Sequence, residues 1–353
     1  MNQSLLLTNG LFTHSDAKTA HGLVRGTERF NIRGVIDHVA TAGKDAGELL
    51  DGKNRAIPVF ATLQEALQQV PDARYLIIGV ATVGGKLPPD MLVQIKAAVE
   101  AGLSIVNGLH EFLTDKPELT ALAEAKGVTL TDVRKPKPRS ELHFWSGEIF
   151  KVPAPIIAVL GMDCAMGKRT TARLLTQAVR RAGKKAEMIY TGQTGWLQGG
   201  KYGFIFDSTV NDFVSGELEH AIVSCWQEER PDIFFIEGQS ALRNPSGPCG
   251  SELLISGNAK KVVLLCSPVR KYFDDDAHWG EIPSVETEIA LIKMLGSEVI
   301  ALALHTAGCS ESEARQWKQE YEKKYSLPVL LPVEEGVDAL VPMLLSLITP
   351  TEL

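Results

Sequence analysis

Apolar runs and amphipathic stretches alternate along this chain in two series, which are separated by a break. In its first part, apolar runs typical of buried strands occur at Leu5–Thr8, Ile32–Ile36, Tyr75–Val80, Ser104–Asn107 and Thr129–Asp132. Amphipathic stretches such as Leu63–Val70 and Met91–Ala101 lie between them and predict helices. Strands that alternate with helices in this way predict a parallel sheet built from βαβ units, and hence an α/β fold.

A second alternating series begins at Ile156, after a break in the pattern. In the break, the run Arg134–Arg139 has closely spaced prolines and positive charges, which suit an extended connector. The strand-like runs of the second series are 156–160, 186–190, 232–236, 262–266, 299–304 and 329–331. The apolar stretch Val337–Ile348 contains Asp338 and Pro342 and cannot span a bilayer, so we expect a C-terminal core helix there.

The first strand of the second series runs into a glycine loop with the sequence GMDCAMGKRT, from Gly161 to Thr170. A helix pattern follows and ends at Gly183. The loop N–H groups, the helix dipole and the Lys168 ammonium would all converge on one anion, which is how a P-loop binds phosphate. Glycines that serve only a turn would leave Lys168 at the positive end of the helix dipole. We therefore predict that phosphates are bound by Gly161, Cys164, Gly167, Lys168, Arg169, Thr170 and Thr171.

This loop differs from the usual P-loop in its spacing and its hydroxyl. Five residues rather than four separate Gly161 from Gly167, and Arg169 stands where a Ser or Thr usually binds Mg²⁺. Thr170 brings a hydroxyl one position late. If a metal binds, we expect Mg²⁺ to be held by Thr170 and Glu237.

Polar loops also follow other predicted strands, and ligands gather beyond the carboxyl ends of strands in open parallel sheets. After 186–190, the residues expected to contact the ligand are Gly192, Gln193 and Thr194. Glu237 ends a strand beside the loop, where it would bind Mg²⁺ or cap a helix. His305 ends another strand and is either structural or part of the site.

Several carboxylates are candidates for acid–base chemistry. Asp163, inside the loop, either stabilises an Asx-type turn or positions a metal, a lysine or an amine. Asp207 and Asp212 stand near the start of a predicted helix, where each is a cap or a contact to a metal or an amine. The cluster Asp274–Asp276 with His278 lacks the spacing of an EF-hand and predicts a solvated acidic turn.

Composition limits the classes of partner. The net charge is −7, which gives no basic surface for nucleic acid. No apolar run is long enough for a signal peptide or a membrane span, so we expect no membrane partner. The five cysteines show no paired spacing and suggest reduced thiols in the cytoplasm. A small-molecule substrate is expected, and the size of the chain suggests a homo-oligomer.

Two partial resemblances add to this picture. The run 161–168 resembles the variant P-loop of dethiobiotin synthetase, including its five-residue spacing and its Asp at the third position, and Ile236–Gly238 is similar to a Glu-Gly that follows a strand there. Segments 57–60, 63–66, 73–78 and 98–106 resemble the CoA-binding Rossmann domain of succinyl-CoA synthetase α-subunits. These resemblances imply a Rossmann-like domain over 1–139, a linker over 140–155 and a P-loop NTPase-like three-layer α/β/α domain over 156–353.

The two halves in this order, with Lys18–Gly22, Gly192–Gly195, Asp212–Phe213 and Glu237–Gln239, resemble domain-of-unknown-function family 1611 over nearly the whole chain. That family includes D-glutamate N-acetyltransferases. The resemblance implies transfer of an acetyl group from acetyl-CoA to the amine of an acidic D-amino acid.

Resemblance and residues together give a mechanistic hypothesis in which the P-loop holds the phosphates of CoA. An amine that attacks a thioester must lose a proton, and the favoured bases are Glu237 and Asp212, with Asp163 as a further catalytic candidate. Backbone donors of Gly192–Gly195 would stabilise the oxyanion, and Arg169 or Arg243 would bind the substrate carboxylate. The alternatives are an ATP- and Mg²⁺-dependent ligase or kinase and a non-catalytic nucleotide-binding protein.

Overall fold

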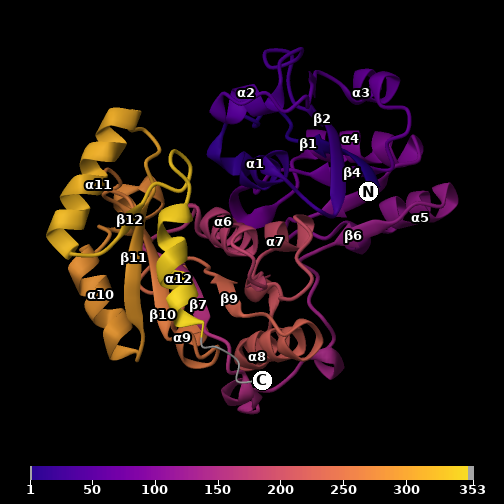
Figure 1. The fold of residues 1–353 in the computed structure, drawn as a ribbon. Helices are drawn as coiled ribbons and strands as arrows, with labels where there is room; N and C mark the ends of the chain where they lie inside the picture. Colours follow the sequence, from indigo (N-terminus) through magenta and orange to yellow (C-terminus); the bar gives the residue numbers. More distant parts are fainter. Residues whose placement is uncertain (1, 349–353) are drawn as a thin grey trace. The chain divides into compact units, whose positions relative to one another are not determined.

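A computed structural model describes residues 2–348 and divides the chain into two compact units. The first unit contains the residues up to Pro136 together with Gln193–Lys201, and the second contains Lys137–Gly192 and the chain from Tyr202 onward. Each unit has one six-stranded sheet in which all neighbouring strands are parallel (Figure 1). Both units are therefore α/β, as the alternating pattern predicts.

The first unit has the strand order β3-β2-β1-β4-β5-β6. Its strands are β1 (Asn2–Leu7), β2 (Phe30–Ile36), β3 (Val59–Phe60), β4 (Tyr75–Ile78), β5 (Ser104–Asn107) and β6 (Leu130–Asp132). Its α-helices are α1 (Lys18–Arg25), α2 (Ala46–Asp51), α3 (Leu63–Gln69), α4 (Pro89–Glu100), α5 (Pro117–Lys126) and α7 (Gln193–Leu197). Short 3₁₀ helices occupy Ser15–Ala17, Val83–Gly85 and Leu113–Asp115. The chain reverses its direction of travel across the sheet between β1 and β4, which is the switch point of a Rossmann-like sheet.

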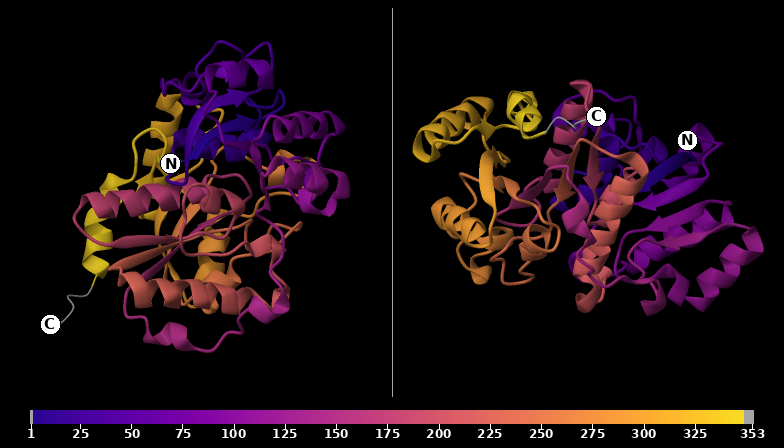
Figure 2. Two further views of the ribbon diagram at one scale, coloured as in Figure 1. Left: turned by 90° about the vertical axis from the view of Figure 1, so that its right-hand side faces the viewer. Right: turned by 60° about the horizontal axis from the view of Figure 1, so that its bottom comes forward.

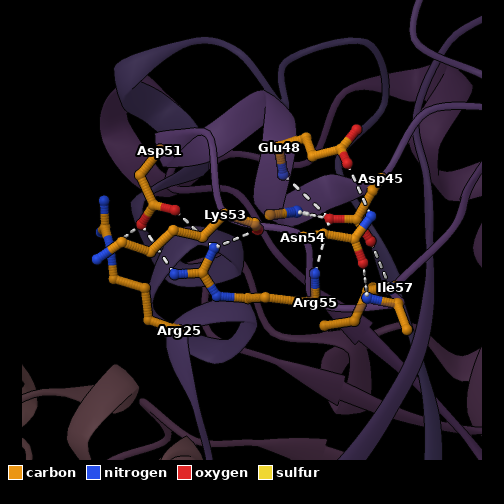
Figure 3. Close-up of polar contacts among 10 residues, drawn as sticks. Arg25, Asp45, Glu48, Asp51, Lys53, Asn54, Arg55 and Ile57 are labelled. Atoms are coloured by element: carbon orange, nitrogen blue, oxygen red, sulfur yellow. Dashed lines mark hydrogen bonds and ion pairs between the residues drawn. The ribbon is translucent and has the colours of Figure 1, made fainter.

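A polar network fixes the loop around α2 (Figure 3). The Asp45 carboxylate accepts hydrogen bonds from the backbone N–H groups of Gly47, Glu48, Arg55 and Ile57. Burial opposes ionisation of Asp45, but these backbone donors outweigh it and lower the pKa of its carboxyl group. Asp51 at the end of α2 lies 2.6 Å from Arg55 and 3.4 Å from Arg25. This network stabilises the loop and leaves its acidic groups fully engaged.

The second unit has the strand order β12-β11-β10-β7-β9-β8. Its strands are β7 (Ile156–Gly161), β8 (Ala186–Ile189), β9 (Ile233–Glu237), β10 (Lys261–Cys266), β11 (Glu298–Leu304) and β12 (Val329–Leu330). Its α-helices are α6 (Lys168–Arg181), α8 (Asn211–Glu229), α9 (Ser251–Ile255), α10 (Val285–Met294), α11 (Glu311–Tyr325) and α12 (Val341–Leu347). Its 3₁₀ helices are Arg139–Glu141, Glu148–Lys151, Phe206–Ser208, Phe273–Asp275, Ala277–Trp279 and Asp338–Leu340.

Helices cover both faces of the second sheet. Helices α6 and α12 pack together on one face, and α8 lies on the other (Figure 2). Every residue of β7 and β9 is buried, which explains why these strands are continuously apolar rather than alternating. The last residue of β9, Glu237, is also buried but is charged, and it lies at the carboxyl edge of the sheet.

Residues 137–151 form a segment, here called the strap, that lies along α8. The buried Glu219 of α8 accepts hydrogen bonds from Ser146 N (2.5 Å), Ser146 Oγ (2.9 Å) and Ile149 N (3.1 Å). Glu217 accepts from His143 N at 3.0 Å and from Lys137 Nζ at 2.8 Å. A Cβ at Gly216 would come within 1.9 Å of the His143 carbonyl oxygen, so the strap requires glycine in mid-helix.

Most of the expected elements are present, with small shifts at their ends. The two-residue strand β3 was not predicted because it is too short to show a period. The segment expected to be a linker, 140–155, belongs to the second unit and includes the strap. In place of one C-terminal core helix, the structure has the 3₁₀ helix Asp338–Leu340 and then α12. No helix within residues 2–348 is both long and apolar enough to cross a membrane.

Candidate functional site

The P-loop of the second unit is built around the side chain of Lys168. This lysine is buried at the start of α6, and its Nζ donates to the Asp163 carbonyl oxygen at 2.6 Å. Its stem is confined between two glycines, since a Cβ at either Gly161 or Gly238 would come within 3.1 Å of Lys168 Cδ. Gly167 precedes the helix with φ +93°, a conformation that favours glycine. The loop is thus shaped for the lysine and leaves the N-terminus of α6 without a side-chain cap.

Glu237 lies at the carboxyl edge of the sheet, in the same site as the lysine. It is buried, and its Oε2 accepts from Thr191 N at 3.1 Å. Gly192 N–H also donates to this carboxylate. Burial raises the pKa of Glu237, and the nearby charges of Arg169 and Lys168 only partly oppose that rise. A carboxyl group with a raised pKa beside a phosphate-binding loop is a candidate acid or base.

The engagement of Gly192 bears on the expected oxyanion site. Thr191 N–H and Gly192 N–H both donate to Glu237, and Thr191 Oγ1 donates to the Glu237 carbonyl oxygen at 2.7 Å. These amides are therefore occupied by Glu237 in this structure, and an oxyanion would have to compete with its carboxylate.

Asp163 joins the P-loop to two neighbouring loops. Its side chain is completely buried and accepts from Asn244 Nδ2 (2.9 Å), Arg270 Nη1 (2.9 Å) and Asp274 N (2.8 Å). Arg270 Nη1 also donates to the Cys164 carbonyl oxygen at 2.9 Å. The interpretation of Asp163 as an Asx-type turn is therefore wrong, because its partners lie far away in the sequence.

Sequence reasoning missed Asn244 and Arg270. Arg270 follows the carboxyl end of β10. Ligands gather beyond the carboxyl ends of parallel strands, so its position in the sequence could have indicated it, as for the loop after β9. Its partnership with Asp163 spans 107 residues, and no local pattern reveals it.

The donor set at the P-loop fits a divalent cation poorly. Within residues 2–348, ligand atoms of Asp163, Cys164 and Asp274 lie within 4.8 Å of one another. However, the Arg270 guanidinium already neutralises Asp163, and it would repel a cation. At the expected Thr170–Glu237 site, Lys168 and Arg169 likewise provide the positive charge beside the carboxylate. The residues at the P-loop therefore do not fit a bound Mg²⁺.

Other candidates lie in different surroundings. Asp207 and Asp212 are exposed, Asp212 in the first turn of α8. Burial lowers the pKa of His305, and the Arg270 charge lowers it further. Arg243 donates to the buried Glu288 at 2.6 Å and to Thr287 at 2.9 Å, so it is part of an ion pair. The acidic turn 274–276 is exposed, as expected.

Gln193 and Thr194 belong to the first unit, where they contact the carboxyl edge of its sheet. Thr194 Oγ1 lies 3.2 Å from Thr19 Oγ1 of α1, and a Cβ at Gly108 would come within 3.0 Å of Gln193 Cγ. Gln198 Nε2 donates to the carbonyl oxygens of Gly22 and Gly26. The segment 193–201 thus lies over α1 and the loop after β5, near the switch point. A role for Gln193 and Thr194 in ligand binding stays a prediction.

An acidic residue, Asp37, follows β2, as in many dinucleotide-binding sheets, but here its carboxylate makes hydrogen bonds within the first unit. Asp37 accepts from Thr8 Oγ1 (2.7 Å), Phe12 N (3.0 Å) and Thr41 Oγ1 (2.8 Å). An acid that binds ribose must present its oxygens to the ligand. Both oxygens of Asp37 are occupied internally, so the first unit shows the Rossmann-like architecture without a ribose-binding acid at this position.

Two family models match this chain, one over most of the first sheet and one over the second. The family described as DUF1611_C P-loop domain, a domain of unknown function, matches residues 143–341, and its companion, the DUF1611_N Rossmann-like domain, matches residues 39–136. The chain belongs to this family. A DUF1611 family protein from Anabaena variabilis has a crystal structure similar to this one, with a TM-score of 0.89 and 29% sequence identity over 98% of this chain and 100% of that chain.

Two relatives of the chain described here have names that state an activity. A D-glutamate N-acetyltransferase of Tritonibacter scottomollicae is 30% identical over 286 residues, which are 79% of this chain and 83% of the relative. A D-glutamate N-acetyltransferase of a Pseudoalteromonas species is 28% identical over 275 residues, or 76% of this chain and 80% of the relative. This chain is thus similar to enzymes that transfer acetyl groups.

Proposed function

We propose that this DUF1611 protein is an N-acetyltransferase that moves the acetyl group of acetyl-CoA to the amine of a small acidic amino acid such as D-glutamate. The observation that carries the proposal is the buried Lys168–Glu237 arrangement at the carboxyl edge of a P-loop sheet. The names of the two relatives support the reaction class. The P-loop supports the donor, because CoA carries a pyrophosphate and a 3′-phosphate.

In the proposed reaction the P-loop binds the phosphates of CoA, and Glu237 accepts the proton of the substrate amine. Lys168 and the N-terminal amides of α6 hold phosphate oxygens of CoA. The substrate amine attacks the thioester carbonyl carbon, the C–S bond breaks, and the products are the N-acetyl amino acid and CoA thiol. The amine proton passes to Glu237, whose raised pKa makes it a better base than an ordinary carboxylate, and then from Glu237 to the departing thiolate sulfur, which yields CoA thiol.

Asp163 has a different role from the catalytic one expected from the sequence. Its carboxylate is fully buried and engaged by three donors, so no oxygen is presented to a reacting group. We assign it a positioning role. Asp212, which is exposed on α8, is the competing candidate for the base.

The test is a direct measurement of N-acetylated product by mass spectrometry, with acetyl-CoA and a panel of D- and L-amino acids. Thiol reagents are avoided because the chain has five free cysteines of its own. We expect product with acidic amino acids. Turnover that requires ATP and Mg²⁺ would contradict the proposal in favour of a ligase or kinase.

Lys168→Ala tests the assigned phosphate site. Loss of a charged hydrogen bond should raise the KM for acetyl-CoA roughly 10- to 100-fold. The matched control is Lys184→Ala, which removes an exposed lysine just beyond α6 and should leave the KM within about 2-fold. An unchanged KM for acetyl-CoA in Lys168→Ala would place CoA elsewhere.

A further inference from the structure

A cavity of about 240 Å³ adjoins the P-loop in the second unit. Met162 and Met166 of the loop line it, as do Tyr321 and Tyr325 of α11. Arg270 also lines it, from the loop after β10. Its apolar walls and charged lining suit a small molecule that has an aliphatic stem and a charged end.

Arg270 is held rigidly at this cavity. Only 15% of its side chain is exposed, and its Nη1 bonds both Asp163 Oδ2 and the Cys164 carbonyl oxygen, each at 2.9 Å. Within residues 2–348, the hydrogen bonds of its guanidinium group are made by Nη1, which leaves Nε and Nη2 to a ligand. A planar guanidinium fixed on one side can bind a carboxylate without losing much rotational freedom on binding.

The other charges of the cavity wall balance one another. Lys271 lies 3.0 Å from Glu281, and Lys324 lies 2.8 Å from Glu286. All four of these residues line the cavity. The carboxylate that pairs with Arg270, Asp163, is not part of the lining. Arg270 differs from the two lysines because its carboxylate partner lies outside the lining. Its remaining donors, Nε and Nη2, rather than an uncompensated charge, favour an anionic group in the cavity.

We propose that this cavity binds the acceptor amino acid and that Arg270, oriented by Asp163, binds its side-chain carboxylate. The proposal rests on the acetyltransferase function proposed above and names its acceptor site. The methionines and tyrosines contact the aliphatic stem, while Met162 and Met166 place the molecule next to the phosphate-binding loop. This arrangement gives the P-loop aspartate its purpose, which is to fix an arginine rather than to react.

The test compares Arg270→Lys with the wild-type protein, using D-glutamate and D-glutamine as acceptors. Lysine retains the positive charge beside Asp163 but loses the planar donor pair. We expect the KM for D-glutamate to rise roughly 10- to 100-fold. The KM for acetyl-CoA should stay within about 2-fold, and the preference for D-glutamate over D-glutamine should fall. Unchanged kinetics, a rise confined to acetyl-CoA, or an equal loss for both acceptors would overturn the proposal.

Further variants separate this role from a structural one. Arg315→Lys is the matched control, because Arg315 is an exposed arginine of α11 paired with Glu311. Asp163→Asn should also raise the KM for D-glutamate, since Arg270 loses its orienting charge. Arg270→Gln would leave Asp163 buried without its cation, so its folding is checked by thermal unfolding. The double variant Asp163→Asn/Arg270→Gln removes both charges and should show the same loss of glutamate preference.

Failure of this proposal can be told from failure of the proposed function. If the wild-type protein forms no acetylated product with any amino acid, the acetyltransferase function fails. The binding of D-glutamate alone is then measured by calorimetry on wild-type protein and Arg270→Lys. Binding that weakens in Arg270→Lys supports the carboxylate site; absent or unchanged binding overturns it.

Discussion

At the scale of single residues, Glu237 shows burial outweighing favourable neighbours. It is a buried carboxyl group with two backbone donors and two nearby cations, and burial dominates so that its pKa is raised. A base with a raised pKa holds its proton to higher pH than an ordinary glutamate. This property ties the local environment of one residue to the pH dependence of the reaction.

We therefore expect the acid limb of the kcat/KM profile to lie above pH 4.5, the ordinary value for Glu. Activity should rise as Glu237 loses its proton. Glu237→Gln should lower kcat roughly 10²- to 10⁴-fold and remove that limb. A full pH profile of wild type and variant checks this.

Asp212→Asn distinguishes the two candidate bases. Because Asp212 is exposed, we expect this variant to keep the kcat and the acid limb of the wild-type protein. If Asp212→Asn removes the acid limb while Glu237→Gln keeps it, Glu237 is not the base.

At the scale of elements, the strap and α8 depend on buried carboxylates. Glu219→Ala would leave the N–H groups of Ser146 and Ile149 without their acceptor. We expect the free energy of unfolding of the second unit to fall by about 2–5 kcal/mol. Urea denaturation measures this change.

Glu148→Ala is the control for the strap, since its carboxylate makes an exposed ion pair with Lys151. It should change the free energy of unfolding by less than about 1 kcal/mol. Equal effects of Glu219→Ala and Glu148→Ala would show that the strap contributes little through its buried bonds.

A stacked pair of histidines also joins the strap to α8. The rings of His143 and His220 stack with centroids 3.6 Å apart, beside Glu217 and Lys137. Partial desolvation and the neighbouring His143 lower the pKa of His220, while Glu217 opposes the shift. A lowered pKa in the folded state gives stability that is complete above pH 6.5 and is lost as pH falls through the folded value.

We expect the Tm of the second unit to fall when the pH is lowered from neutral to about 5, and to fall less in His220→Gln. Thermal unfolding followed across this range measures both slopes. Identical slopes for wild type and variant would assign the pH dependence to other groups.

At the scale of the whole molecule, the two units are interleaved in sequence. Residues 193–201 fall inside the stretch matched by the P-loop domain, yet they belong to the first unit. Leu197 is completely buried in the core of the first sheet, and Arg29 donates to the carbonyl oxygens of Trp196 and Gly200. The first unit is therefore completed by a segment that comes late in the chain.

Leu197→Ala should accordingly destabilise the first unit, by about 2–5 kcal/mol. Hydrogen exchange should quicken in β1 and β4 and stay unchanged in β7. Met294→Ala, at an exposed position, is the control and should affect neither unit. Faster exchange in β7 alone would contradict the assignment of this segment.

The sequence by itself determined the α/β class, nearly all the strands and the P-loop. Local patterns carry these features: continuous apolar runs mark strands buried on both faces, and a glycine loop before a helix marks a phosphate site. Lys168 and Glu237 could be named for the same reason, since strand ends are visible in the sequence.

Only the tertiary structure decided the partners of the polar groups. Asp163 meets Arg270 and Asn244 across long stretches of chain, and Thr191 and Gly192 turn their N–H groups to Glu237. The strap packs on α8, and segment 193–201 joins the first sheet. Such contacts depend on how distant segments pack, and a one-dimensional pattern contains no information on which buried polar group will satisfy which other.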